Sequence, residues 1–344
     1  MAAFNPLNIS TDAGVGTNDV RDEMKTFYKK GLLKYAEKRT VLAQFGQDAT
    51  IPRNQGMIYE WRIASQLTKV TGAATLISTE GATPDGSSLH FVKMTATTAQ
   101  YGDYYAGSDI LDETIYDPIR TIVVDAQAYQ MAQVMDNLIQ VAAVKAATNR
   151  RYSNAASGGT TTHATIAQGD IITETEIRKV VRDLRRASAK PLRDGNFVAV
   201  IHPDTTYTLF QDPDIREAMV NSKLMKDGSK AGSLFTGEIG EYMGVTFIET
   251  ELAKVVLATV DDGAAAWETV NATVDVYQTI FFAADYFGKI KLTGLNSDSI
   301  YHPVGSSGAA DALNQRWTQG WKMTFGARLL FPLYAVVLEH ANAL

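Results

Sequence analysis

Alternation of apolar and polar positions marks two extended segments in the first third of the chain. In residues 56–65, Ile58, Tyr59, Trp61 and Ile63 supply the β-branched and aromatic side chains typical of strands. Alternation resumes from about Leu89. Between the two lies a polar stretch of more than twenty residues that includes STEGATPDGSS, where Gly, Pro, Asp and Ser favour turns. The pattern predicts a long β-ribbon over residues 56–105.

A two-stranded ribbon of this length is a problem for an isolated chain. Two strands alone are only marginally stable in water, and their open edges invite pairing with another chain. Both difficulties disappear if a neighbouring copy covers the ribbon. The alternative is a hairpin that packs on its own domain and leaves its loop in solvent. The pattern alone leaves both interpretations open.

Two other segments carry helical periodicity. Residues 20–45 place apolar side chains at helical spacing with lysines largely between them, which predicts an amphipathic helix that runs to about Phe45. Further along, Asp117 followed by Pro118 is a strong helix start. The apolar stripe that follows predicts a helix of about 30 residues, or about 45 Å.

The second half of the chain predicts a compact mixed domain and then strands. Thr173 and Glu176 stand at capping-box spacing at the start of a helix, and FVAVI is a buried strand. The segment Gly294–Gln315 is expected to be a long loop between C-terminal strands. The fold class is therefore α+β. The predicted order is an arm (1–19), an N-terminal helix and lead-in (20–55), the ribbon (56–105), a long helix (106–150), a linker or surface loop (151–170), a mixed α/β domain (171–275) and C-terminal strands (276–344).

Composition excludes several classes of protein. The net charge is −6 and there is no cysteine, so a general nucleic-acid binder, disulfides and thiolate metal sites are not expected. The N-terminus has neither the basic region nor the apolar region of a signal peptide. The longest apolar run, Leu329–Leu338, is about half the length of a membrane span, so no membrane association is expected.

Catalytic motifs are missing from the sequence. It contains no P-loop, no nucleophile elbow and no HExxH zinc motif. His202, which precedes Pro203 and Asp204 at a strand end, is the best enzyme-like candidate. A turn with a helix cap explains this stretch better, because no nucleophile or second acid accompanies the histidine. We predict that the protein is not an enzyme and has no cofactor or metal.

A basic helix is the densest positive feature of the chain. Arg178, Arg182, Arg185 and Arg186 are interleaved with Glu174, Glu176 and Asp183. No aromatic side chains accompany them to stack on bases. A solvated, inter-subunit or lumen-facing helix is therefore favoured over a DNA site.

The order of these parts resembles the major capsid proteins of tailed bacteriophages, which have the Hong Kong 97-type coat fold. Local sequence is similar to the branch typified by the podovirus N-four, in the loop residues Glu80, Gly81, Thr83, Pro84 and Gly86 and in a strand that ends in Gln100-Tyr101-Gly102. The late Gly320-Trp321-Lys322 is similar to that branch's closing strands. The resemblance covers essentially the whole chain.

The resemblance implies an N-arm, an extended loop (E-loop), a spine helix in a peripheral domain and an axial domain. It also implies hexamers and pentamers that close an icosahedral shell around double-stranded DNA, without sequence-specific binding. Portal protein is an implied partner, as are scaffold and decoration proteins, and assembly would take place in the host bacterial cytoplasm. The expected inter-subunit residues are Glu80, Gly81, Thr83, Pro84, Asp85 and Gly86 of the E-loop. No crosslinking motif accompanies Lys69 or Lys93, so a non-covalent shell is expected.

Two alternatives remain open at this stage. An encapsulin-like nanocompartment shell shares the fold but packages enzymes, so the cargo distinguishes it. A soluble α+β enzyme with His202 in its site would be a small oligomer.

Overall fold

The computed structural model describes residues 40–64, 88–115, 118–145, 149–153, 163–192, 195–218, 238–257, 274–293, 297–306, 311 and 313–343. These residues fall into two compact units. Unit 1 contains the described parts of Gln100–Met135 and Ser297–Met323, and unit 2 contains those of Arg39–Ala99, Asp136–Asn296 and Thr324–Leu344. Helix α3 (Ile119–Lys145) and strand β13 (Arg316–Leu329) contribute residues to both units.

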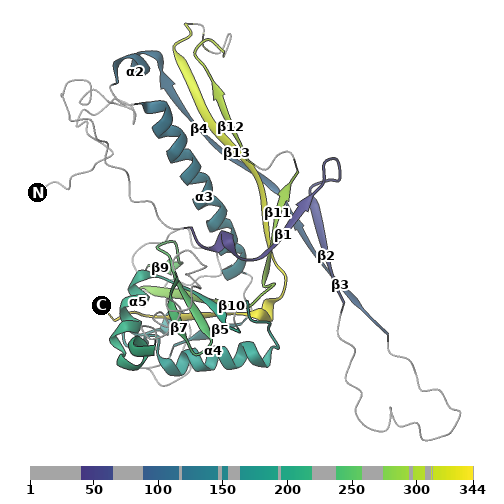
Figure 1. Ribbon diagram of the computed structural model, residues 1–344, viewed down its shortest axis with the longest axis vertical. Helices are drawn as coiled ribbons and strands as arrows, with labels where there is room; N and C mark the ends of the chain where they lie inside the picture. The colour runs from purple at the N-terminus through teal and green to yellow at the C-terminus, as the bar shows by residue number, and fades with distance from the viewer. Residues whose placement is uncertain are drawn as a thin grey trace, which may run out of the picture. The chain divides into compact units, whose positions relative to one another are not determined.

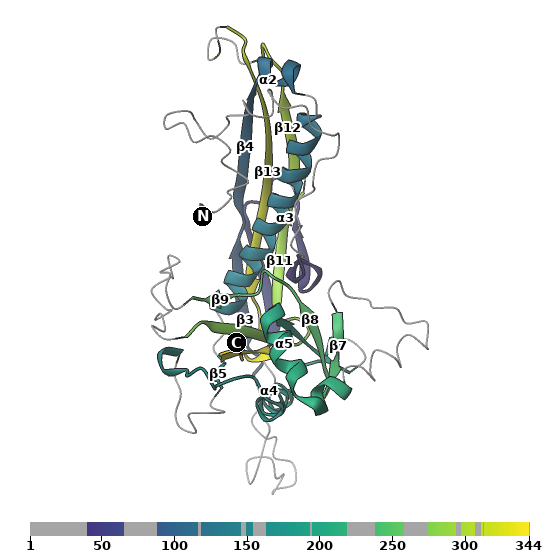
Figure 2. The same cartoon turned by 90° about the vertical axis from the view of Figure 1, so that its left-hand side faces the viewer.

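Unit 1 is a sheet with a long helix on one face (Figures 1 and 2). Strand β13 pairs antiparallel with β12 and also pairs with β4. Helix α3 is held to the sheet by polar contacts: Gln127 Nε2 donates to the carbonyl oxygen of Gln319, and Trp321 Nε1 donates to Gln130 Oε1 at 2.9 Å. The predicted long helix is confirmed. The other elements are β4 (Ala99–Ser108), α2 (Asp109–Thr114) and β12 (Ser297–His302).

Strand β12 corrects the sequence analysis, which expected a loop over Gly294–Gln315. Every residue from Ser297 to His302 is exposed. A strand with no buried face shows no alternation, so hydrophobic patterning could not find it. Main-chain pairing with β13, from Ser297 opposite Met323 to His302 opposite Thr318, makes it a strand.

Two glycines allow β4 and β13 to approach closely. A Cβ at Gly102 would lie 2.7 Å from the carbonyl oxygen of Trp321, and one at Gly320 would lie 3.1 Å from the Cβ of Tyr104. Any side chain at Gly102 would therefore collide with main chain that cannot move aside. The two short motifs that carry the sequence resemblance thus meet face to face.

Unit 2 contains a mixed sheet with strand order β5-β14-β10-β6-β8-β7. Helices α4 (Glu174–Arg186) and α5 (Pro203–Gln211) pack on this sheet (Figure 1). Strand β6 is buried along its whole length, as its apolar run predicts. The strands are β5 (Arg150–Tyr152), β6 (Phe197–Ile201), β7 (Glu238–Tyr242), β8 (Val245–Glu249), β9 (Val255–Val256), which pairs with β10, β10 (Val276–Phe282) and β14 (Ala335–His340).

The predicted ribbon is confirmed in its two strands, β2 (Ile58–Ala64) and β3 (Phe91–Thr97), which pair antiparallel. Its base packs on strands β1 (Gln47–Ile51) and β11 (Phe287–Leu292), which run parallel. Trp61, 8% exposed, is the largest side chain of this contact. It packs against Gly288, where a Cβ would lie 2.5 Å from the indole ring.

The lead-in to β1 differs from the helix predicted to reach Phe45. Residues 20–39 lie outside the described part, and Leu42–Gln44 is only a short 3-10 turn, η1. Val41, Leu42 and Phe45 are buried. Asp136 of α3 accepts hydrogen bonds from the main-chain nitrogens of Val41 and Ala43, so a side chain from elsewhere in unit 2 satisfies this turn.

The start of helix α4 differs from the predicted capping box. Thr173 is the N-cap of α4, but its side chain makes no capping hydrogen bond, and Glu176 pairs instead with Lys179 at 2.7 Å. The predicted capping box is therefore not formed.

No helix among the described residues is long and apolar enough to cross a membrane.

Candidate functional site

The ribbon is the first candidate site, because its outer end is exposed and apolar. Tyr59, Trp61 and Ile63 alternate with residues of the other face, and the first two form an edge-to-face pair with ring centroids 4.7 Å apart. Towards the loop, Phe91 is 61% exposed and Val92 is 47% exposed. Five of the large exposed apolar residues lie on or beside β2 and β3: Met57, Ile58, Leu89, Phe91 and Val92.

The residues predicted to make the inter-subunit contact lie outside the described part of the chain. These are Glu80, Gly81, Thr83, Pro84, Asp85 and Gly86, and Lys69 lies outside it as well. Lys93 is described: it lies on β3 with its Nζ 3.7 Å from Glu60 Oε1. The structure therefore describes the paired strands β2 and β3 that lead to the predicted contact, and the contact residues themselves stay a prediction.

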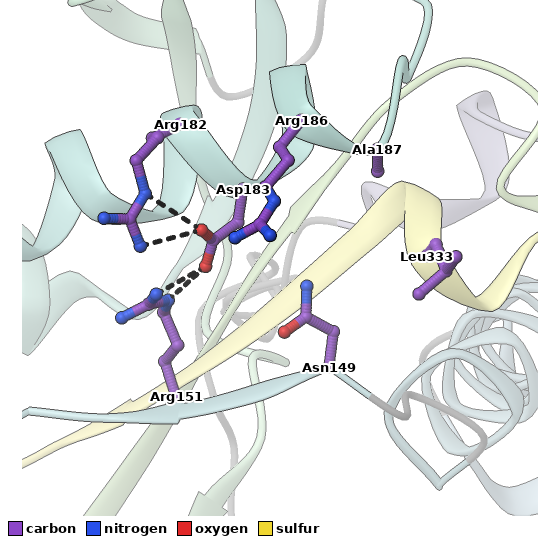
Figure 3. Close-up of a pocket in the computed structure, with 7 residues that line it drawn as sticks. All are labelled: Asn149, Arg151, Arg182, Asp183, Arg186, Ala187 and Leu333. Carbon is purple, nitrogen blue, oxygen red and sulfur yellow. Dashed lines mark hydrogen bonds and ion pairs between the residues drawn. The ribbon is translucent and has the colours of Figure 1, made fainter. Parts of the chain in front are cut away.

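The predicted basic helix is α4, and its four arginines have different surroundings. Arg178 forms an ion pair with Glu174, one turn earlier on the same helix. Arg185 lies beside Gly244, at the turn between β7 and β8. Arg182 and Arg186 line an open pocket of about 590 Å³ (Figure 3).

This pocket, which we call the arginine pocket, also contains residues that the sequence analysis missed. It is lined by Asn149, Arg151, Arg182, Asp183, Arg186, Ala187 and Leu333. Arg151 comes from β5 and contacts Asp183 with its Nε, at 2.6 Å, and with its Nη2, at 2.5 Å. Arg182 approaches the other carboxylate oxygen of Asp183 at 3.0 and 3.2 Å. No helical periodicity links Arg151 to α4, so only the folded chain reveals this cluster.

The electrostatics of the pocket keep Asp183 ionised. Partial burial would raise the pKa of its carboxyl group, but the hydrogen bonds and charges of Arg151 and Arg182 outweigh burial and lower that pKa. The carboxylate therefore serves as a fixed anchor between two guanidinium groups.

His202, the enzyme-like candidate of the sequence, is the N-cap of α5. Its Nδ1 accepts a hydrogen bond from the main-chain nitrogen of Asp204 at 3.3 Å and lies 3.2 Å from Asp204 Oδ2. Tyr277 donates a hydrogen bond to Asp204 at 2.7 Å; burial first, and this bond second, raise the pKa of Tyr277 to about 12. In the described part of the chain, no group of three or more His, Asp or Glu residues could hold a metal ion.

A buried histidine predicts how stability depends on pH. Burial lowers the pKa of His340 from its ordinary 6.5 to about 4. Between these two pH values the unfolded chain binds a proton that the folded chain does not. The stability contributed by the neutral ring is thus complete above pH 6.5 and is lost as the pH falls towards 4, by about 3 kcal/mol. Urea denaturation at pH 7 and pH 4.5 measures this loss.

The variant His340→Gln separates this group from the rest of the acid response. It should lose clearly less stability than the wild type over the same interval, whereas His302→Gln, on the exposed strand β12, should behave as the wild type does. Equal losses in wild type and His340→Gln would contradict the assignment.

Known proteins share the fold. No family model and no curated protein sequence matches this chain. Among solved structures, the capsid of the cyanophage P-SCSP1u is similar with a TM-score of 0.63 at 16% identity, over 99% of this chain and 100% of that one. The capsid of Ralstonia phage GP4 gives a TM-score of 0.67 at 11% identity, over 91% and 96%. The head of the Helicobacter pylori bacteriophage KHP40 gives 0.63 at 13% identity, over 96% and 98%.

These likenesses extend over nearly the full length of both chains in each pair. They therefore extend over the ribbon, the long helix and the sheets, and are not confined to one shared motif. The fold predicted from the sequence is confirmed: the chain has the Hong Kong 97-type coat fold of tailed-phage capsid proteins.

Proposed function

We propose that the protein is a major capsid protein whose copies assemble into the icosahedral shell of a tailed bacteriophage. The observation that carries the proposal is the likeness to phage capsids over 99% of this chain and 100% of the cyanophage chain. Such a protein has a structural role and needs no catalytic group. The anchored ribbon with an apolar outer end is consistent with a contact between copies.

The finer proposals concern the partners and parts of the chain. Copies would form hexamers and pentamers around double-stranded DNA, with the E-loop residues Glu80–Gly86 on the adjacent subunit, which covers the ribbon edges. Portal, scaffold and decoration proteins would join the same shell, built in the host bacterial cytoplasm. The domain boundaries given above stay predictions, with unit 1 as the peripheral domain and the α4–α5 sheet of unit 2 as the axial domain.

The test is negative-stain electron microscopy of the full-length chain at rising concentration. We expect closed shells, tubes or hexameric capsomers. Phe91→Ser should reduce assembly. It should change the free energy of unfolding by less than about 0.5 kcal/mol, because the side chain it replaces is 61% exposed. Tyr207→Ser, another exposed aromatic, is the control for a general loss of surface apolarity.

Two outcomes would contradict the proposal. Monomers or dimers at every concentration, also with the cognate scaffold protein present, would favour the enzyme alternative. Particles purified from infected or producing cells that contain protein cargo and no DNA would favour the encapsulin-like alternative.

A further inference from the structure

We propose that the arginine pocket binds a phosphate group. Its charged lining consists of three guanidinium groups and one carboxylate, so it carries an excess of two positive charges in a chain whose net charge is −6. The groups come from two elements, β5 and α4, and face one cavity (Figure 3). A cation cluster of this kind attracts an anion from solution.

The geometry of Asp183 prepares two of the arginines for a ligand. Arg151 contacts one carboxylate oxygen and Arg182 contacts the other. Each guanidinium has five N–H donors, so both groups keep donors that Asp183 does not use. The carboxylate holds the two forks side by side, which removes part of the side-chain entropy that a ligand would otherwise have to overcome.

Arg186 supplies the charge that Asp183 does not compensate. Within the described part of the chain it forms no ion pair and no side-chain hydrogen bond. Its place in the last turn of α4 is favourable beside the helix dipole. Asp183 brings Arg151 of a different element to the same cavity, so Arg186 lies beside a pair of arginines that share one carboxylate. An anionic ligand would balance the remaining positive charge.

The lining suits an oxyanion such as phosphate. Guanidinium forks match the oxygens of phosphate, as they match those of a carboxylate, and Asn149 adds an amide side chain. The lining contains no aromatic side chain on which a base could stack, so recognition would stop at the phosphate. The phosphate could come from the backbone of double-stranded DNA or from free phosphate. Only the first source depends on the proposed capsid function.

The DNA arm of the test measures binding of a fluorescent 20-base-pair duplex by anisotropy at several salt concentrations. The double variant Arg182→Gln, Arg186→Gln should bind about eightfold more weakly near 0.1 M salt, with a slope of log K against log salt that is shallower by about 0.9, as for one lost phosphate contact. The matched control is Arg178→Gln, on the same helix but outside the pocket, which should reduce binding by less than about twofold.

The second arm uses inorganic phosphate against chloride at equal ionic strength, with thermal unfolding as the readout. Phosphate should raise the Tm of the wild type and of Arg178→Gln more than that of the double variant. If only this arm responds, the phosphate is free; if both respond, DNA is a source. Assembly of the same variants, followed by microscopy, reports separately on the proposed function.

The proposal is overturned if neither arm distinguishes the double variant from Arg178→Gln. It is also overturned if the pocket variants change assembly alone, because the pocket would then be a contact between copies.

Discussion

Replacing Trp61 with alanine is expected to lower the free energy of unfolding by about 3–5 kcal/mol, because it opens a cavity at the base of the ribbon. Trp61 is 8% exposed and packs with Ala49, Ile51 and Ile290, while Gly288 provides the space for its ring. Urea denaturation of the full-length chain measures the loss.

The matched control is Phe91→Ala, on the same ribbon. Phe91 is 61% exposed, so its removal should change stability by less than about 0.5 kcal/mol. Under the proposed function the order is reversed for assembly: the variant that loses less stability should lose more of its ability to form particles. Trp61→Ala should form particles wherever it remains folded at low temperature, whereas Phe91→Ala should assemble poorly although it is folded. Similar stability losses in the two variants would mean that the ribbon is not anchored through Trp61.

The parts of the fold that the sequence predicts are those with a local signal, and that signal differs from one element to the next. Strand β2 and the inner part of β3 alternate between two faces. Strand β6 is an uninterrupted apolar run, and helix α3 begins after Asp117-Pro118. Strand β12 carries none, because its main chain is paired but all its side chains are exposed. The short turn η1 lies within the segment that sequence patterning assigned to a helix. Asp136 accepts hydrogen bonds from its main-chain nitrogens, and a partner 93 to 95 residues away leaves no trace in a local pattern.

The candidate site shows the same limit more strongly. Sequence patterning could find Arg182 and Arg186, because they recur on one helix. It could not find Arg151, which is 32 residues from its partner Asp183 and belongs to a three-residue strand. A pocket formed by two separate elements is a property of the tertiary fold, and no local pattern encodes it.

The resemblance motifs are explained by packing. Gly102 lies where Trp321 brings its main chain close, and Gly320 lies beside Tyr104. Both glycines therefore serve the contact between β4 and β13. Short motifs around them indicate a shared fold because two facing strands require them, and they need no catalytic or binding role.

The second large effect is expected from Glu339→Ala on β14. Glu339 is fully buried and forms an ion pair with Arg150 of β5. His163 Nδ1 lies 2.5 Å from Glu339 Oε2, and Gln278 Nε2 donates to Oε1, the oxygen that Arg150 contacts, at 3.5 Å. Removing the carboxylate leaves the Arg150 guanidinium, 20% exposed, without this counter-charge. The expected loss is about 3–5 kcal/mol, measured by urea denaturation.

A double variant separates the lost attraction from the cost of an Arg150 charge that no longer faces this carboxylate. Arg150→Met combined with Glu339→Leu should be more stable than Glu339→Ala by at least about 1 kcal/mol, because the half-buried charge that faced Glu339 is then removed together with the carboxylate. Glu251→Ala removes a carboxylate from an exposed position and should stay within about 0.5 kcal/mol of wild type. If the double variant is less stable than Glu339→Ala, Arg150 stabilises the fold even without the Glu339 carboxylate. Attraction within the network would then hold β5 against β14, and β14 would depend on charge as well as on its apolar neighbours.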